Sequence, residues 1–136
     1  MERTRYPGFV EYQKILIVED EMISALDLQN QLRRLGYEVS GLAKSGEEAV
    51  RLAKELHPDL VLMDVNLSGP MDGIEASERI QELKPIPVVY LTAYPNIFVR
   101  NPNRMQQPYM CISKPLSIPD LQASINIALD PTRRPT

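Results

Sequence analysis

This chain of 136 residues has little of several features that would assign it to a class of protein. It has one cysteine, Cys111, and so cannot form an internal disulfide. No apolar run approaches the ~18 residues that a membrane span needs, and Met1 to Gln13 has no signal-peptide pattern. The net charge is −3 without a dense run of Lys or Arg, so we expect no contact with nucleic acid or with a membrane. These absences favour a cytoplasmic protein.

The sequence does contain a regular alternation of two kinds of apolar segment. With 43% hydrophobic residues, the chain fits one domain with a core of its own. Short aliphatic runs typical of buried strands alternate with stretches in which apolar residues recur at helical spacing. The predicted strands are Lys14 to Val18, Glu38 to Ala43, Leu60 to Met63, Val88 to Leu91 and Met110 to Ser113, and the predicted helices are Met22 to Leu35, Ala49 to Leu56, Ile74 to Leu83 and Pro119 to Leu129. This order predicts an α/β fold with a parallel sheet and helices on both faces.

The ends of these helices carry recognisable capping residues. Ser45 and Glu48 have the spacing of a capping box, and Ser117 is a predicted N-cap of the last helix. Gly36 stands where a C-terminal cap belongs. The first helix is predicted to be amphipathic, with its apolar stripe made of Met22, Leu26, Leu28, Leu32 and Leu35.

Polar and charged residues follow four of the five predicted strands. Glu19 and Asp20 follow the first strand, Asp64 the third, Thr92 the fourth and Lys114 the fifth. In a parallel sheet the carboxyl ends of the strands meet at one edge, where ligands bind. We therefore expect these side chains to form one site.

The acidic members of this group suit a hard cation. Three carboxylates brought together repel one another and favour Mg2+, which takes a few carboxylate or carbonyl oxygens and keeps several waters. Asp20 and Asp64 are the predicted direct ligands, the backbone carbonyl of Asn66 a third, and Glu19 is expected to act through water. A carboxylate such as Asp64 can also attack phosphorus, with the metal, Lys114 and Thr92 neutralising the phosphoryl oxygens.

Four stretches of the sequence together resemble the receiver domain of two-component response regulators. They are ILIVEDE (Ile15 to Glu21), PDLVLMDVNLSGPMDGIEA (Pro58 to Ala76), YLTAY (Tyr90 to Tyr94) and SKP (Ser113 to Pro115). The resemblance covers about Lys14 to Leu129. It implies a flavodoxin-like, doubly wound sheet of order 2-1-3-4-5, with residues 1–13 as an extension and 130–136 as a tail or the start of a linker.

The resemblance also implies roles for the residues at the strand ends. Asp64 would accept a phosphoryl group from a sensor histidine kinase or a phosphotransfer protein, and the chain would pass the signal to an unknown output protein or domain rather than act as an enzyme. Glu19, Asp20, Asp64 and the Asn66 carbonyl would bind Mg2+, and Thr92 and Lys114 would contact the phosphoryl group. The sequence leaves open whether the chain forms a homodimer.

The sequence departs from the family pattern in its second half. Cys111 stands where receivers usually have an aromatic residue, although Tyr109 lies two residues earlier. Pro102 falls within the expected fourth helix and predicts that this helix is short, shifted or irregular. An alternative interpretation is therefore a binding module that works without phosphorylation through an altered fourth-helix face, with Ile97 to Val99 either exposed there or packed inward.

Other chemistries fit the sequence less well. A phosphatase with an aspartate nucleophile needs an acid two residues after it, and that residue is Asn66. A flavin carrier would have a phosphate-binding loop after the first strand, where this chain has acids. Asp72 and His57 are predicted to be helix-end residues rather than ligands or catalysts. Cys111 is predicted to be a small buried apolar residue rather than a redox group.

Overall fold

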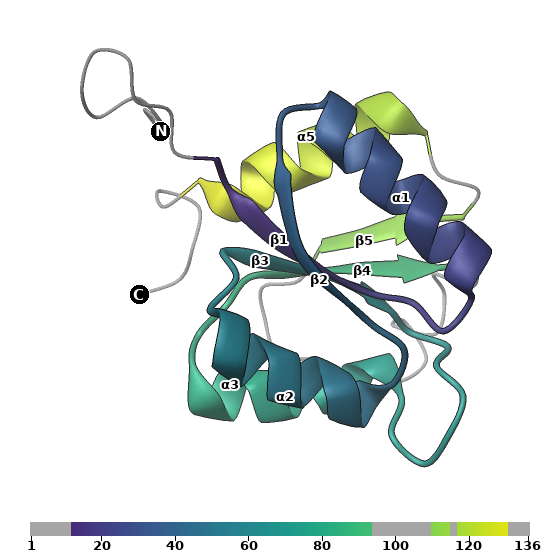
Figure 1. Cartoon of the computed structure of the whole chain (residues 1–136), viewed down its shortest axis with the longest axis vertical. Helices are drawn as coiled ribbons and strands as arrows, with labels where there is room; N and C mark the ends of the chain where they lie inside the picture. Colours follow the sequence, from purple (N-terminus) through teal and green to yellow (C-terminus); the bar gives the residue numbers. More distant parts are fainter. Residues whose placement is uncertain (1–11, 94–109, 115–116, 131–136) are drawn as a thin grey trace.

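From residue 14 to residue 92, strands and helices alternate as the sequence predicts. The computed structural model describes residues 12–93, 110–114 and 117–130, and Figure 1 shows how their elements are arranged. The elements are β1 (Lys14–Val18), α1 (Met22–Arg34), β2 (Glu38–Ala43), α2 (Gly46–Leu56), β3 (Leu60–Asp64), α3 (Gly73–Leu83), β4 (Val88–Thr92), β5 (Met110–Ser113) and α5 (Ile118–Leu129). The predicted irregular fourth helix, with Pro102, lies outside the described residues.

The strands form a parallel sheet of order β2-β1-β3-β4-β5. Helices α1 and α5 cover one face of this sheet, and α2 and α3 cover the other (Figure 1). The predicted doubly wound, flavodoxin-like fold is confirmed. Within the described part of the chain, no helix has both the length and the apolar character that crossing a bilayer requires.

Successive residues of the central strands face opposite layers of the core. Ile15 and Ile17 pack with α1 and α5, whereas Leu16 and Val18 pack with α2 and α3. In β3 every residue is buried, as expected for a strand covered by helices on both faces. The carboxyl ends of the strands are therefore held at one edge by a core on each side.

The predicted helix caps are confirmed. The Ser45 hydroxyl accepts from the Glu48 amide at 3.1 Å, and the Glu48 carboxylate accepts from the Lys44 amide at 2.7 Å. The Ser117 hydroxyl accepts from the Asp120 amide at 3.4 Å. Gly36 has a φ of 95°, a left-handed conformation that glycine adopts without a steric penalty, just after α1 ends.

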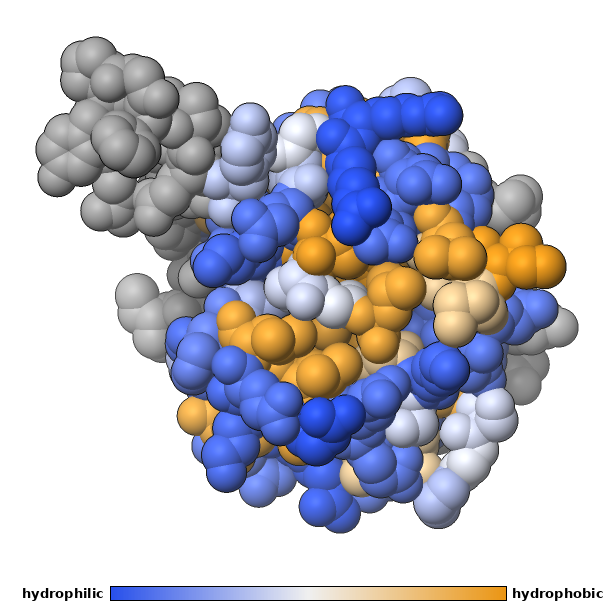
Figure 2. Space-filling model, in the orientation of Figure 1, coloured by the Kyte–Doolittle hydropathy of each residue, from blue (hydrophilic) through white to orange (hydrophobic). Residues whose placement is uncertain are grey.

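The predicted apolar stripe of α1 is partly wrong. The buried residues are Ala25, Leu28 and Leu32, whereas Met22 and Leu26 are exposed. The stripe that meets the sheet runs through Ala25, a small residue that the pattern of large side chains did not single out. Ile23, near the start of α1, is exposed as well. Figure 2 shows apolar surface over this end of the helix.

The edge strand β2 contains an irregularity. Ile15 pairs with Val39 and Leu16 pairs with Gly41, so the register passes over Ser40. An extra residue of this kind is a β-bulge, which bends a strand and increases its twist.

Candidate functional site

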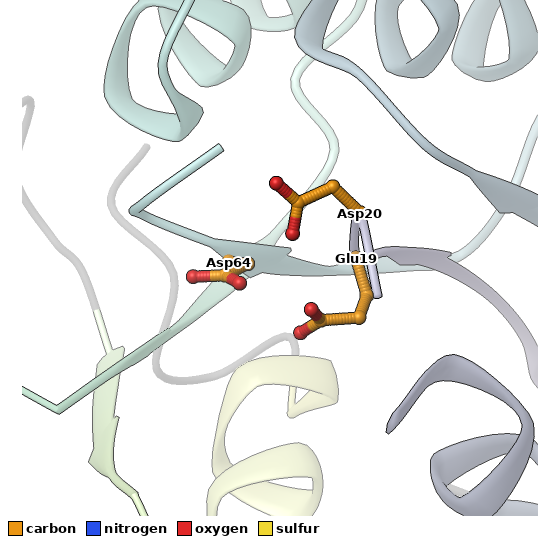
Figure 3. Close-up of side chains that lie close together, drawn as sticks. All are labelled: Glu19, Asp20 and Asp64. Atoms are coloured by element: carbon orange, nitrogen blue, oxygen red, sulfur yellow. The ribbon is translucent and has the colours of Figure 1, made fainter. Parts of the chain in front are cut away.

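The structure brings Glu19, Asp20, Asp64 and Lys114 together at the carboxyl edge of the sheet. Glu19 and Asp20 follow β1, Asp64 is the last residue of β3, and Lys114 follows β5. One carboxylate oxygen from each of the three acids lies within 4.8 Å of the other two. Figure 3 shows the three carboxylates around a common space between the ends of β1 and β3.

Lys114 is the cation of this group. Its Nζ donates to Oδ2 of Asp64 at 3.2 Å and to Oε2 of Glu19 at 3.4 Å. Partial burial acts to lower the pKa of Lys114, but the charges of Asp64 and Glu19 outweigh it and raise this pKa above 10.5. Lys114 therefore stays protonated and partly offsets the repulsion between the two acids.

Glu19 is buried, as Asp64 is. Its Oε1 accepts from the backbone amide of Glu21 at 3.1 Å. Burial is the main reason why its pKa lies above 4.5, and the charge of Asp64 adds to this effect. A buried carboxylate with a raised pKa beside two other acids is an environment that a divalent cation would stabilise.

Asp64 is buried, but hydrogen-bond donors reach both of its carboxylate oxygens. Its Oδ1 accepts from the backbone amide of Asn66 at 2.9 Å, while Lys114 serves Oδ2. The Asn66 side chain itself is exposed. Whether the Asn66 carbonyl is a metal ligand stays a prediction.

Thr92 lies at the same edge as the charged residues. It is the last residue of β4, is 1% exposed, and pairs with Ser113 of β5. Its backbone carbonyl accepts from the Lys114 amide at 2.9 Å. This hydrogen bond holds the backbone of Lys114 against the end of β4. The expected contact of Thr92 with a phosphoryl group stays a prediction.

Ser68 belongs to the site, although sequence reasoning did not single it out. Its backbone amide donates to Oδ2 of Asp20 at 3.0 Å, and its hydroxyl donates to the same oxygen. The hydroxyl contact is the main reason why the pKa of Asp20 lies below 3.8. The sequence feature that could have indicated it is its position two residues after Asn66, in the loop that follows Asp64.

The remaining predictions have different outcomes. Asp72 is the N-cap of α3 and accepts from the Glu75 amide at 2.9 Å, and His57 is the C-cap of α2, so both are helix-end residues as predicted. Cys111 is half-buried against the core, and burial raises the pKa of its thiol, which disfavours the reactive thiolate. Tyr94, Tyr109 and Ile97 to Val99 lie outside the described residues.

Comparisons with known proteins agree with this geometry. The family model described as "Response regulator receiver domain" matches residues 15–126. The chain belongs to the response regulator receiver family. Transcriptional regulatory protein PdtaR of Mycobacterium tuberculosis is 39% identical over 124 residues, which are 91% of this chain and 60% of that protein. Phyllosphere-induced regulator PhyR of Methylorubrum extorquens is 35% identical over 85% of this chain and 43% of its own length.

Solved receiver structures are also similar. The receiver domain of a modulated diguanylate cyclase from Desulfovibrio desulfuricans G20 has a TM-score of 0.78 and 36% identity, over 88% of this chain and 94% of that one. The receiver domain of PhyR from Erythrobacter litoralis has a TM-score of 0.80 and 29% identity, over 92% and 95% of the two chains.

Membership of the receiver family fixes the broad role of the chain. Response regulator receivers act in two-component signalling, where they interact with histidine kinases and output domains, and they bind Mg2+ at an acidic cluster. This chain spans 60% and 43% of the lengths of the PdtaR and PhyR relatives.

Proposed function

We propose that this receiver accepts a phosphoryl group on Asp64 from a phosphohistidine of a partner kinase or phosphotransfer protein, in the presence of Mg2+. One observation carries the proposal: Asp64 lies within reach of two other carboxylates and of Lys114, whose Nζ is 3.2 Å from Oδ2 of Asp64. A carboxylate held between acids and a lysine is poorly explained as a structural ion pair, because one lysine cannot neutralise three acids.

The donor set fits Mg2+. All three acids offer the hard oxygen ligands that this ion prefers, and Glu19 is buried enough that an additional positive charge would stabilise its ionised form. Asp20 and Asp64 would hold the ion together with the Asn66 carbonyl, and Glu19 would act through water. When bound, Mg2+ would neutralise negative charge on the phosphoryl oxygens.

Asp64 would be the nucleophile of the transfer. One of its carboxylate oxygens forms the new O–P bond while the N–P bond of the phosphohistidine breaks, and the electron pair of that bond returns to the imidazole nitrogen. Lys114 would donate to a phosphoryl oxygen, and the Thr92 hydroxyl to another, since both residues lie at the same edge. Phosphoryl transfer depends mainly on such positioning and charge neutralisation.

The phosphorylated chain would signal by a shift between two conformations. Contacts of Thr92 and Lys114 with the phosphoryl group would favour one arrangement of the neighbouring loops, which an output protein or domain would read. We propose that the chain acts in the cytoplasm as a phosphoacceptor rather than as an enzyme with a released product.

A protein donor would approach Asp64 past the start of α1. Met22, Ile23 and Leu26 are exposed there, within six residues of Asp20 in the sequence, and Ile23 is 86% exposed. Exposed apolar side chains beside a reactive group suit contact with another protein. We name Met22, Ile23 and Leu26 the α1 patch.

Phosphorylation from a small donor tests the proposal directly. The chain is incubated with acetyl phosphate with and without Mg2+, and intact mass spectrometry measures the phosphorylated fraction. We expect one phosphoryl group per chain with Mg2+, little without it, and none in Asp64→Asn. A wild-type chain that stays unmodified under conditions that phosphorylate a control receiver would contradict the proposal.

The alternative function is a binding module that works without phosphorylation. The half-buried Cys111 at the usual aromatic position favours it, because a thiol cannot make the large inward rotation of an aromatic ring. The intact acidic group favours phosphorylation instead. If the acetyl phosphate experiment gives no phosphoprotein, the binding module becomes the better explanation.

A further inference from the structure

Ser68 makes a double contact with one oxygen of a predicted metal ligand. Its backbone amide and its hydroxyl both donate to Oδ2 of Asp20, 48 positions away in the sequence. Ser68 lies in the loop between β3 and α3, and Asp20 in the loop after β1. The contact therefore joins the loop that follows β1 to the loop that follows β3.

This contact is the second of two anchors on the β3–α3 loop. The first is the Asn66 amide, which donates to Oδ1 of Asp64 at 2.9 Å. The carbonyl of Asn66 belongs to the peptide between these anchors, so its direction depends on both of them. Ser68 thus affects the placement of the Asp20 carboxylate and of the Asn66 carbonyl.

We propose that Ser68 is a positioning residue for Mg2+. This inference rests on the proposed function. The Ser68 hydroxyl holds Oδ2 of Asp20 against the β3–α3 loop, which orients the carboxylate so that Oδ1 faces Glu19 and Asp64. Hydrogen bonds to carboxylates that bind metals orient them, and their loss lowers metal affinity by about 10- to 100-fold. Ser68 itself does not coordinate the ion.

A purely structural role for Ser68 predicts a different result. Ser68 is exposed, so losing its hydroxyl leaves no cavity in the core. If the hydroxyl only stabilised the loop, Ser68→Ala would lower the unfolding temperature of the metal-free chain and leave Mg2+ affinity unchanged. A variant that keeps its fold but loses Mg2+ affinity therefore distinguishes the positioning role from a purely structural one.

The test compares Mg2+ binding by isothermal titration calorimetry in the wild type, Ser68→Ala and Ser68→Thr. We expect Ser68→Ala to bind Mg2+ about tenfold more weakly, at the lower end of the usual range because the Ser68 amide still donates to Asp20. Ser68→Thr keeps the hydroxyl and should bind within about threefold of the wild type. Ser45→Ala is the matched control, since it removes a hydroxyl contact that caps α2 and does not involve Asp20.

Kinetics provide a second readout. With acetyl phosphate as the donor, the Mg2+ concentration that gives half the maximal phosphorylation rate should rise about tenfold in Ser68→Ala. The rate at saturating Mg2+ should stay within about twofold of the wild type, because Asp64 and Lys114 are unchanged. Asp20→Asn, which loses a ligand, should not regain its rate in this way.

The outcomes separate this inference from the proposed function. Equal Mg2+ affinity of Ser68→Ala and the wild type would overturn the role of Ser68 alone, as would a Ser68→Thr chain as weak as Ser68→Ala. A wild-type chain that binds no Mg2+ and gains no phosphoryl group would overturn the proposed function itself.

Discussion

Gly73 packs so closely against Asp64 that a Cβ atom on Gly73 would lie 2.1 Å from the backbone carbonyl oxygen of Asp64. The Gly73 amide also donates to the carbonyl of Val65 at 3.1 Å. The first residue of α3 is therefore seated on the backbone of the predicted phosphoacceptor. Any side chain at position 73 must displace either the start of α3 or the backbone of Asp64.

Gly73→Ala should lower both stability and Mg2+ affinity. Forcing a methyl group into this contact costs about 1–3 kcal/mol of unfolding free energy or more, and a shift of Asp64 changes the distances among the acids. Urea unfolding and Mg2+ calorimetry measure the two effects. Gly36→Ala is the control, because it strains a left-handed residue that has open space around it. A Gly73→Ala chain with wild-type Mg2+ affinity would show that α3 does not position Asp64.

Lys114→Met should destabilise the chain more without Mg2+ than with it. The substitution leaves the buried Glu19 and Asp64 without their shared cation. We expect a loss of about 1–2 kcal/mol of unfolding free energy without the ion, less than for a fully buried pair because solvent screens the lysine. Thermal unfolding with and without Mg2+ measures the difference, and Lys114→Arg, which keeps the charge, is the control. An equal loss under both conditions would contradict the shared-site interpretation.

The pKa values of Asp20 and Glu19 should be shifted in opposite directions from those of ordinary carboxyl groups. The pKa of Asp20 is lowered below 3.8, so its ionised form stabilises the fold above pH 3.8, and this contribution is lost as the pH falls through the folded-state pKa. The pKa of Glu19 is raised above 4.5, so its protonated form stabilises the fold. This contribution is lost as the pH rises through the folded-state pKa. Carboxyl NMR of the metal-free chain measures both values, and a Glu19 that titrates below Asp20 would contradict the burial argument.

Asp72→Ala should weaken α3 without changing the metal site. The lost cap costs about 1 kcal/mol of unfolding free energy, because the Glu75 amide loses its acceptor. We expect Mg2+ affinity to stay at the wild-type value in calorimetry. A large fall in Mg2+ affinity would instead make Asp72 part of the acidic site.

Ile23→Glu should slow phosphorylation by protein donors only. Ile23 is 86% exposed, so the change in unfolding free energy should stay within about 0.5 kcal/mol. Phosphotransfer is measured from a panel of autophosphorylated histidine kinase domains and, separately, from acetyl phosphate. Ile127→Glu, on the last turns of α5 away from the site, is the matched control. Equal slowing with acetyl phosphate would show that the α1 patch does not act through donor contact.

Much of the site could be predicted because strand ends are easy to locate. Continuous aliphatic runs such as Leu60 to Met63 identify central parallel strands, and the residue after such a run must lie at the carboxyl edge. This reasoning placed Glu19, Asp20, Asp64 and Lys114 together. In the structure one oxygen of each acid lies within 4.8 Å of the other two, and Lys114 donates to Glu19 and Asp64. Helix caps at Ser45 and Ser117 were predictable because capping depends on local spacing.

The parts that were missed depend on contacts between distant segments. Ser68 looks like any loop serine, since only folding brings it to Asp20. The buried stripe of α1 runs through Ala25, and a pattern of large apolar residues does not show that a small residue faces the core. The register irregularity at Ser40 depends on how two strands pair, which neither strand encodes alone.

That irregularity has a consequence for crowded solutions of this protein. β2 is an outer strand, and a straight outer strand is a template on which a strand from a neighbouring molecule can align. Because of the extra residue, the backbone donors and acceptors on the outer edge of β2 are not evenly spaced for pairing with a strand of another molecule. A bulge in an edge strand therefore disfavours pairing with a strand of another molecule. Deleting Ser40 would straighten β2 and increase the tendency of the protein to aggregate.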